Sequence, residues 1–271
     1  AYLVDEENCR YVLSEGQKCA VCERKYPKDC IILDEEDSST DIEVGNIIIA
    51  TGYELLDVSQ IDQYGYGKFP NVLTSLEFER LTNASGSTGG KIVCKTKQYN
   101  RKTKQDEWVF TPEGMPPRNV AIIHCVGSRN KNYNAYCSRV CCMYSLKFAH
   151  LIKEKIPNVN VYEFYIDMRA FGKGYEEFAE RIKAEGTHVI RGHSADVSMD
   201  GEQMKVRGED ILNDRLVEFD VDMVVLAVGL VPSPGTEALT RMLGISKDKD
   251  GWLSELDYNG NPTDTDKGGI Y

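Results

Sequence analysis

Eight of the nine cysteines in this chain fall into two groups. The first cysteine set is Cys9, Cys19, Cys22 and Cys30, and the second cysteine set is Cys125, Cys137, Cys141 and Cys142. Thiolates bind zinc and iron–sulfur clusters, and in a reducing compartment such uses are favoured over structural disulfides. The grouping therefore predicts metal or redox chemistry at two places in the chain.

The second cysteine set lies where an expected strand at 119–124 leads into an expected helix at 138–155. Cys137 and Cys141 are four residues apart, so on a helix they would share one face, with Cys142 beside them. Cys125 follows the strand directly. A helix N-terminus favours thiolates because its dipole is positive there. Four thiolates from one strand end and one helix start predict a [4Fe–4S] cluster.

Three other uses of the second cysteine set stay open. Buried cysteines can be chemically inert, but four of them at one strand–helix junction make that interpretation unattractive. Structural zinc sites usually use two C-x2-C knuckles, which the C-x3-C-C spacing here does not provide. A redox disulfide is the third alternative. The pattern favours the iron–sulfur cluster over each of them.

The first cysteine set contains Cys19-x2-Cys22, followed by Pro27, which is similar to half of a ferredoxin-type ligand run. Cys9 and Cys30 would complete four ligands for a second cluster. A C-x2-C pair also fits zinc or a redox site, so these alternatives remain. Cys94 stands alone in an expected strand and is interpreted as a small buried side chain.

The elements around the second cysteine set predict an α/β fold. Strands are expected at 119–124, 159–166, 187–191 and 221–229, with helices at 138–155 and 175–185 and a meander before 215. This alternation predicts a parallel sheet with right-handed crossovers, as in Rossmann-type domains. No G-x-G-x-x-G fingerprint follows the first strand. The second cysteine set therefore occupies the turn where a nucleotide's pyrophosphate would normally bind.

Outside this region we expect a buried strand at 46–52, a short helix at 75–81 capped by Ser75, and a hairpin or linker at 91–117. The formal net charge of −11 argues against nucleic acid as a partner. No apolar run approaches the roughly 20 residues of a membrane helix, and the start lacks a signal-peptide pattern. A cytoplasmic location is expected.

Several motifs resemble the A subunit of heterodisulfide reductase. They are residues 125–129 (CVGSR), 136–142 (YCSRVCC), 166–178 (IDMRAFGKGYEEF), 64–67 (YGYG), 70–72 (PNV) and 74–81 (TSLEFERL). The likeness covers nearly the whole chain, and bacterial homologues and quinone-interacting oxidoreductase subunits share the cysteine motif. The chain is thus identified as similar to a family built like thioredoxin reductase, with an FAD domain and an NAD-like domain.

The resemblance implies four regions. They are a partial FAD-binding domain with the cysteine-rich segment at 1–90, a hairpin or linker at 91–117, an NAD-like α/β domain with the iron–sulfur site at 118–235, and a return to the FAD-binding domain at 236–271. In this two-dinucleotide-binding flavoprotein superfamily, Ala50, Thr51, Gly52, Ala227, Val228 and Gly229 would approach the flavin. Glu79 and Lys147 would lie near the isoalloxazine ring, although the residues alone suggest ordinary helix-surface charges.

The implied function is electron transfer between FAD and iron–sulfur clusters, in some complexes with bifurcation at the flavin. Implied partners are other subunits of such a complex and an electron donor of the hydrogenase, formate dehydrogenase or ferredoxin type. A pyridine-nucleotide-dependent oxidoreductase and a zinc-binding structural module remain alternatives. The chain departs from the family at Tyr26, where a cysteine is expected, so Cys30 would substitute. The glycine fingerprint strand and the closing flavin segment are missing, which suggests a fragment.

Overall fold

The computed structural model describes residues 4–25, 31–33 and 38–271. The chain divides into two compact units, one running up to Ile48 and including Gly269–Tyr271, the other spanning Ile49–Gly268. The smaller unit contains the 3-10 helix η1 (Val12–Ser14), the short helix α1 (Val21–Lys25) and a β-bridge between Ile47 and Ile270. The second cysteine set belongs to the larger unit.

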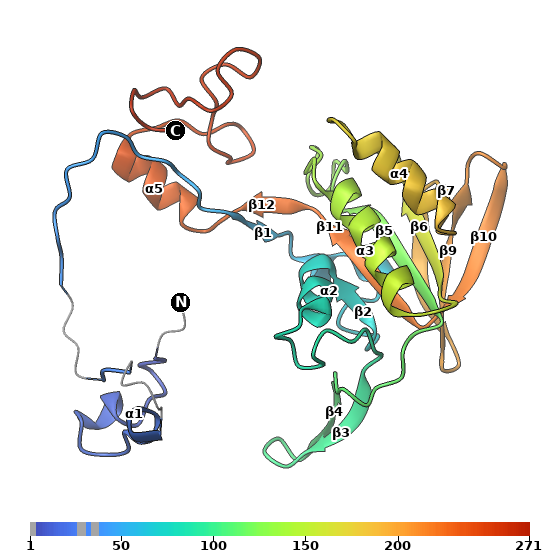
Figure 1. The fold of residues 1–271 in the computed structure, drawn as a ribbon, viewed down its shortest axis with the longest axis horizontal. Helices are drawn as coiled ribbons and strands as arrows, with labels where there is room; N and C mark the ends of the chain where they lie inside the picture. The colour runs from blue at the N-terminus through green and yellow to red at the C-terminus, as the bar shows by residue number, and fades with distance from the viewer. Residues whose placement is uncertain (1–3, 26–30, 34–37) are drawn as a thin grey trace. The chain divides into compact units, whose positions relative to one another are not determined.

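A five-stranded parallel sheet forms the centre of the larger unit (Figure 1). Its order is β2 (Val72–Thr74), β11 (Met223–Val228), β5 (Asn119–Val126), β6 (Asn160–Tyr165) and β7 (His188–Arg191). Helix α3 (Cys141–Lys155) connects β5 to β6, and helix α4 (Tyr175–Ala184) connects β6 to β7. The predicted α/β class with a parallel sheet is confirmed.

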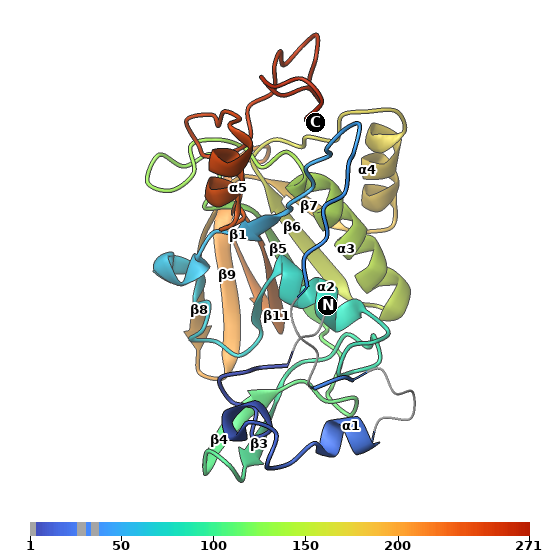
Figure 2. The same ribbon diagram turned by 90° about the vertical axis from the view of Figure 1, so that its left-hand side faces the viewer.

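The sheet separates two hydrophobic cores. Alternate residues of a strand point to opposite faces, so Val120 and Ile122 enter one core while Ala121 and Ile123 enter the other. Helices α2 (Ser75–Thr82), α3 and α4 cover the first face. The second face is covered by the antiparallel meander β8 (Ser194–Asp200), β9 (Gln203–Asp210) and β10 (Arg215–Val221), as Figure 2 shows. The central strands are therefore buried on both sides.

The remaining elements of the larger unit are short. They are the antiparallel pair β1 (Tyr53–Leu55) and β12 (Leu230–Pro232), the 3-10 helices η2 (Val58–Gln60) and η3 (Asp62–Tyr64), the hairpin β3 (Thr96–Asn100) and β4 (Gln105–Val109), and helix α5 (Thr236–Leu243). The hairpin lies within the predicted 91–117 segment. Strand β2 and helix α2 pack with the central sheet, although the predicted boundaries place residues 1–90 in the other domain.

The strand expected at 46–52 is wrong. This segment is extended, but its one ladder contact among the described residues is the bridge from Ile47 to Ile270, and the side chain of Ile48 is 80% exposed. Its β-branched residues favour a strand, yet a strand persists only where neighbouring strands satisfy its backbone hydrogen bonds. Likewise the strand after Lys91 begins only at Thr96.

Two helix starts also differ from prediction. Helix α3 begins at Cys141, three residues after the expected Ser138, because Arg139 adopts a left-handed φ of 67°. Cys137 therefore lies in a loop and shares no helix face with Cys141. Helix α2 is capped by Thr74 and not by Ser75, and Glu77 completes a capping box.

In the described part of the chain, no helix combines the length and the apolar character needed to cross a membrane.

We expect Thr74→Ala to lower the free energy of unfolding by about 1 kcal/mol, the usual loss when a cap is removed. The Thr74 hydroxyl accepts a hydrogen bond from the Glu77 N–H at 3.3 Å. Thr82→Ala, at the opposite end of α2, is the matched control and should cost less. Urea denaturation of both variants measures the difference, and equal losses would contradict the capping assignment.

Candidate metal centre and adjoining cavity

The end of strand β5 is shaped to redirect the chain. Cys125 has a left-handed φ of 57°, and the pairing with β11 shifts register between Leu226 and Val228, which is a bulge. Gly127 follows with a φ of 73°, and a Cβ there would lie 2.3 Å from the Leu56 side chain. Only glycine fits both the conformation and the space. The bulge and the turn aim Cys125 toward the start of α3.

The loop after β5 folds back on itself. The Asn134 N–H donates to the Gly127 carbonyl at 3.0 Å, and the Arg129 N–H donates to the Tyr136 carbonyl at 2.9 Å. The Ser138 hydroxyl accepts from the Leu230 N–H at 2.9 Å. These bonds return Cys137 to the end of the strand that precedes it. Its sulfur already accepts a hydrogen bond from the backbone N–H of Arg139 at 3.3 Å.

The structure brings the second cysteine set together. Cys141 and Cys142 are buried in the first turn of α3, and Cys125 is buried at the strand end. Burial first, and then the other three thiols of the set, raise the pKa of the Cys125 thiol to about 12, because each of these thiols disfavours a neighbouring negative charge. Burial is also the main reason that the pKa of Cys141 is raised. Because these four thiols interact with one another, the binding of a cation that neutralises their thiolates would be favoured.

Cys142 differs from its neighbours because a histidine lies beside it. Burial alone would raise the pKa of its thiol, but His124 and a hydrogen bond with the Arg169 backbone together outweigh burial and lower it. The Nε2 atom of His124 is 2.7 Å from the Glu163 carboxylate, and both side chains are fully buried. Although burial opposes the charged form, Cys142 and Glu163 raise the pKa of His124 to about 9. The thiol of Cys142 therefore faces a positive group.

Several buried side-chain atoms lack a hydrogen-bond partner among the described residues, including the acceptor Glu163 Oε2. Three of these atoms can donate and belong to side chains beside the second cysteine set, namely His124 Nδ1, Arg129 Nη1 and the Tyr144 hydroxyl. Each belongs to a side chain that interacts electrostatically with the thiols: His124 with Cys142, Arg129 with Cys125 and Cys137, and Tyr144 with Cys141. A buried donor without a partner is costly, so these donors indicate that further acceptors belong here. Thiolates and inorganic sulfides would supply them.

A single metal ion and a cluster require different arrangements of thiolates. Within residues 4–25, 31–33 and 38–271, no three His, Cys, Asp or Glu side chains form a group that could hold one metal ion. In a cubane, each thiolate binds a different iron, so its four ligands are spread around a larger group.

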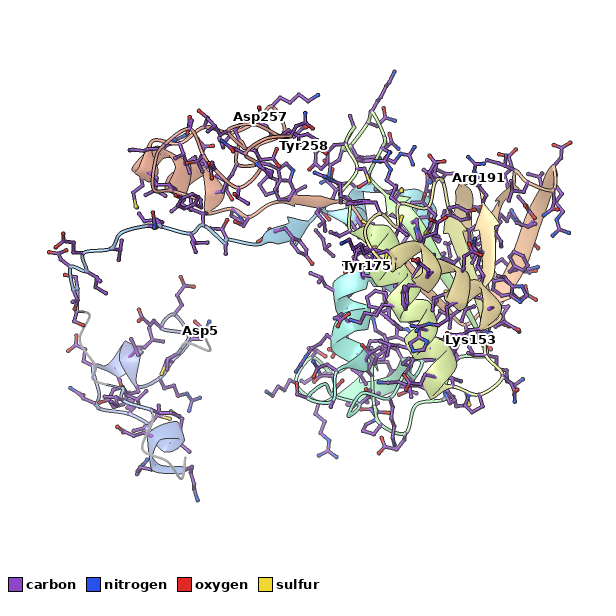
Figure 3. The ribbon with its side chains drawn as sticks, turned by 45° about the horizontal axis from the view of Figure 1, so that its top comes forward. Asp5, Lys153, Tyr175, Arg191, Asp257 and Tyr258 are labelled. Carbon is purple, nitrogen blue, oxygen red and sulfur yellow. The ribbon has the colours of Figure 1, made fainter. Side chains whose placement is uncertain are left out.

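A cavity of about 660 Å³ adjoins the second cysteine set. Its walls are residues 49–53, residues 136–139 and part of the loop after α5, including Trp252 and Tyr258. Tyr258 is labelled in Figure 3 next to Asp257, and its hydroxyl accepts a hydrogen bond from Arg139 at 3.0 Å. Trp252 packs edge-on against Tyr136. Cys137 is thus part of both the thiol group and the cavity wall.

The predicted flavin-contacting residues divide into two groups. Ala50, Thr51 and Gly52 line the cavity. Ala227 and Val228 are fully buried in β11, and the Gly229 N–H donates to the Val126 carbonyl at 2.7 Å beside the Cys125 turn. Glu79 and Lys147 pair with each other at 2.8 Å on the surface of α2 and α3, each about half exposed, outside the cavity wall. The flavin-contacting roles of residues 50–52 and 227–229, and the roles of Glu79 and Lys147 near the isoalloxazine ring, stay predictions.

The first cysteine set lies in the smaller unit. Cys9 is partly buried, whereas Cys19 and Cys22 are exposed, and Cys19 has a φ of 89°. Cys30 and Tyr26 lie outside the described residues. Cys94, in the larger unit, is partly buried and lies outside any strand; burial raises the pKa of its thiol to about 12, and its Sγ donates to the Asp222 carbonyl.

Sequence reasoning missed His124, Glu163 and Tyr144. One signal was present, since Glu163 is a carboxylate in the middle of an apolar strand and such a residue needs a buried partner. The sequence also carries no sign of the partner of Arg129, whose Nη2 donates to the Asp167 carboxylate at 2.8 Å. Arg191, labelled in Figure 3, donates to the other oxygen of the same carboxylate.

Curated relatives agree with the resemblance suggested by the motifs. The chain is 43% identical over 257 residues to the A subunit of the H2:CoB–CoM heterodisulfide,ferredoxin reductase of Methanothermobacter thermautotrophicus. It is 37% identical over 273 residues to the iron–sulfur A subunit of the CoB–CoM heterodisulfide reductase of Methanocaldococcus jannaschii. These matches cover 94% and 99% of this chain. The chain is therefore a relative of the heterodisulfide reductase A subunits.

The chain spans 37% and 38% of the length of these two relatives. No family model matches the chain. Among solved structures, thioredoxin reductase of T. acidophilum aligns with 83% of the chain and 55% of its own, at a TM-score of 0.44 and 14% identity. A thioredoxin reductase of Lactococcus lactis aligns equally well, at 16% identity.

Replacing Gly127 tests whether the turn after β5 is sterically constrained. Gly89→Ala is the control, because Gly89 has a similar φ of 64° and an added Cβ there would meet no described atom within 4 Å. We expect Gly89→Ala to cost about 1 kcal/mol of unfolding free energy from the left-handed conformation alone. Gly127→Ala should cost about 3 kcal/mol, because the clash with Leu56 is added. Denaturant midpoints measure both, and similar losses would show that the turn has room.

Proposed function

We propose that this chain is an electron-transfer segment of an iron–sulfur flavoprotein oxidoreductase related to heterodisulfide reductase. The observation that best supports this proposal is the position of Cys137. This residue belongs to the second cysteine set and also lines the adjoining cavity. An electron carrier bound by the thiols and a flavin bound in the cavity would then be neighbours. The names of the relatives, which describe a reductase and an iron–sulfur subunit, support this proposal.

For the second cysteine set we propose ligation of one [4Fe–4S] cluster by Cys125, Cys137, Cys141 and Cys142. Support comes from the mutual proximity of the thiols, their place at the N-terminus of α3, and the three unpartnered donors around them in the described part of the chain. The backbone N–H of Arg139 holds Cys137 in place, and the bulge at Cys125 aims that side chain. When bound, such a cluster would accept and release single electrons.

For the cavity we propose the reactive part of an FAD. Its volume of about 660 Å³ is within the range of small-molecule sites, and aromatic and backbone groups supply its walls. The residues Ala50, Thr51 and Gly52 have small side chains, and Trp252 and Tyr258 supply aromatic parts of the wall. For Ala227, Val228 and Gly229 we propose a supporting role behind the Cys125 turn, and for Glu79 and Lys147 a role near the ring.

For the whole protein we propose membership of a heterodisulfide-reductase-like complex in the cytoplasm. Its electron donor would be a hydrogenase, formate dehydrogenase or ferredoxin type of protein, and bifurcation at the flavin belongs to the same proposal. One relative's name includes H2 and ferredoxin. For the first cysteine set we propose a second cluster on Cys9, Cys19, Cys22 and Cys30. The predicted domain boundaries are kept as part of this proposal.

Serine substitutions test the ligands of the cluster. Cys141→Ser and Cys142→Ser in protein purified without oxygen should each lose roughly four iron atoms per chain, because a [4Fe–4S] cluster is lost as a unit. The control is Cys94→Ser, whose thiol bonds to the Asp222 carbonyl away from the site. Iron and sulfide analysis measures the loss. Unchanged iron in both variants would refute the ligand assignment.

Filling the cavity tests the flavin site. Ala50→Trp places an indole against a cavity wall, and we expect flavin per chain to fall roughly tenfold, equivalent to about 1.4 kcal/mol of binding. Iron content should not change, because Ala50 is outside the cysteine set. Met242→Trp, at an exposed position of α5, is the control. Flavin retained at the original level in Ala50→Trp would place the flavin elsewhere.

A further inference from the structure

His124 and Glu163 form a fully buried polar pair beneath the second cysteine set. His124 is on β5 and Glu163 on the neighbouring strand β6, with Nε2 and Oε1 2.7 Å apart. The register pairs Ile122 with Glu163, so Glu163 shares the face of Ile122, and His124 shares it by alternation. That face is covered by α3, whose first turn contains Cys142. The pair therefore lies between the sheet and the thiols.

Hydrophobic residues of similar size would pack at these positions without a polar penalty, so the pair needs an explanation. Burying two ionisable groups costs free energy unless every polar atom is satisfied. Here His124 Nδ1 and Glu163 Oε2 both lack a hydrogen-bond partner within the described ranges. The His124 side chain interacts electrostatically with Cys142, and its Nε2 is already engaged by Glu163, so Nδ1 is the ring nitrogen left for the sulfur. The unpartnered nitrogen thus points to an acceptor that forms at Cys142.

We propose that His124 is a positioning residue that donates its Nδ1–H to the Cys142 sulfur when this sulfur binds the cluster. Glu163 orients the ring by accepting a hydrogen bond from Nε2–H. The donated bond raises the reduction potential of the cluster. This inference rests on the proposed function, because it requires the second cysteine set to hold a cluster.

The physical reason is electrostatic. A reduced cluster has one more negative charge than an oxidised cluster, and its thiolate sulfurs share that charge. A hydrogen-bond donor at a ligand sulfur therefore stabilises the reduced state more than the oxidised state. Outer partners of this kind fix the orientation of a histidine through its second nitrogen, as Glu163 does here at 2.7 Å.

Two substitutions separate hydrogen-bond donation from simple packing. An asparagine amide nitrogen takes the position of Nδ1, so His124→Asn keeps a donor facing Cys142 and loses the contact with Glu163. A glutamine amide takes the position of Nε2, so His124→Gln keeps the Glu163 contact and loses the donor. If the pair served packing alone, His124→Gln would be the milder change.

The measurement is a redox titration of the cluster, followed by EPR, in the full chain purified without oxygen. We expect His124→Gln to lower the ratio of reduced to oxidised cluster roughly tenfold at the original midpoint, which is about 59 mV for one electron. His124→Asn should stay within about twofold of the unsubstituted protein. A potential unchanged in His124→Gln with full iron content, or shifted more in His124→Asn, would overturn the inference.

A second measurement starts from the unsubstituted protein. After labelling with 15N-histidine, pulsed EPR of the reduced cluster should show a weakly coupled histidine nitrogen and an exchangeable proton. In His124→Gln the histidine nitrogen signal should vanish, whereas an exchangeable proton from the Arg139 N–H at Cys137 should remain. Absence of the histidine signal in the unsubstituted protein, or a coupling strong enough for direct coordination to iron, would overturn the inference. If the unsubstituted protein contains no iron at all, the proposed function itself fails.

Discussion

The constraint on which the rest depends is the reversal of the chain at the end of β5. A parallel strand in an α/β sheet normally leads through a short turn into its helix, and the turn is open for phosphates. Here a bulge at Cys125 and a left-handed glycine at Gly127 start a loop that folds back before α3 begins. Hydrogen bonds within the loop and to Leu230 hold it there. The space beside the helix N-terminus is thereby filled with sulfur atoms.

The same reversal connects the two proposed cofactor sites. Because the loop is bonded to Leu230 at the start of β12, Tyr136, Cys137 and Ser138 become part of the cavity wall. Strand β12 pairs with β1, which follows the cavity residues 49–52. A single short segment thus positions a proposed cluster ligand and shapes the cavity. The donors beside the thiols include the Arg139 backbone N–H, which bonds to Cys137, and the unpartnered His124 Nδ1.

Some of this could be predicted from sequence and some could not. The runs of β-branched residues at 119–124 and 221–228 predict the parallel sheet, because a continuous apolar run is typical of a strand that is buried on both faces. The extended segment at 46–52 has the same composition but lacks neighbouring strands among the described residues, which composition does not reveal. The loop position of Cys137 depends on the left-handed Arg139, a conformation without a sequence signature. The roles of His124 and Glu163 arise only from the register of β5 against β6.

The central claim is that the second cysteine set holds a [4Fe–4S] cluster. The most direct measurement is a crystal structure of protein purified and crystallised without oxygen, with anomalous X-ray data collected at the iron edge. We expect an iron-containing density that bonds to the sulfur atoms of Cys125, Cys137, Cys141 and Cys142. A single zinc ion at these thiols, or iron bound elsewhere while the four thiols remain free, would contradict it.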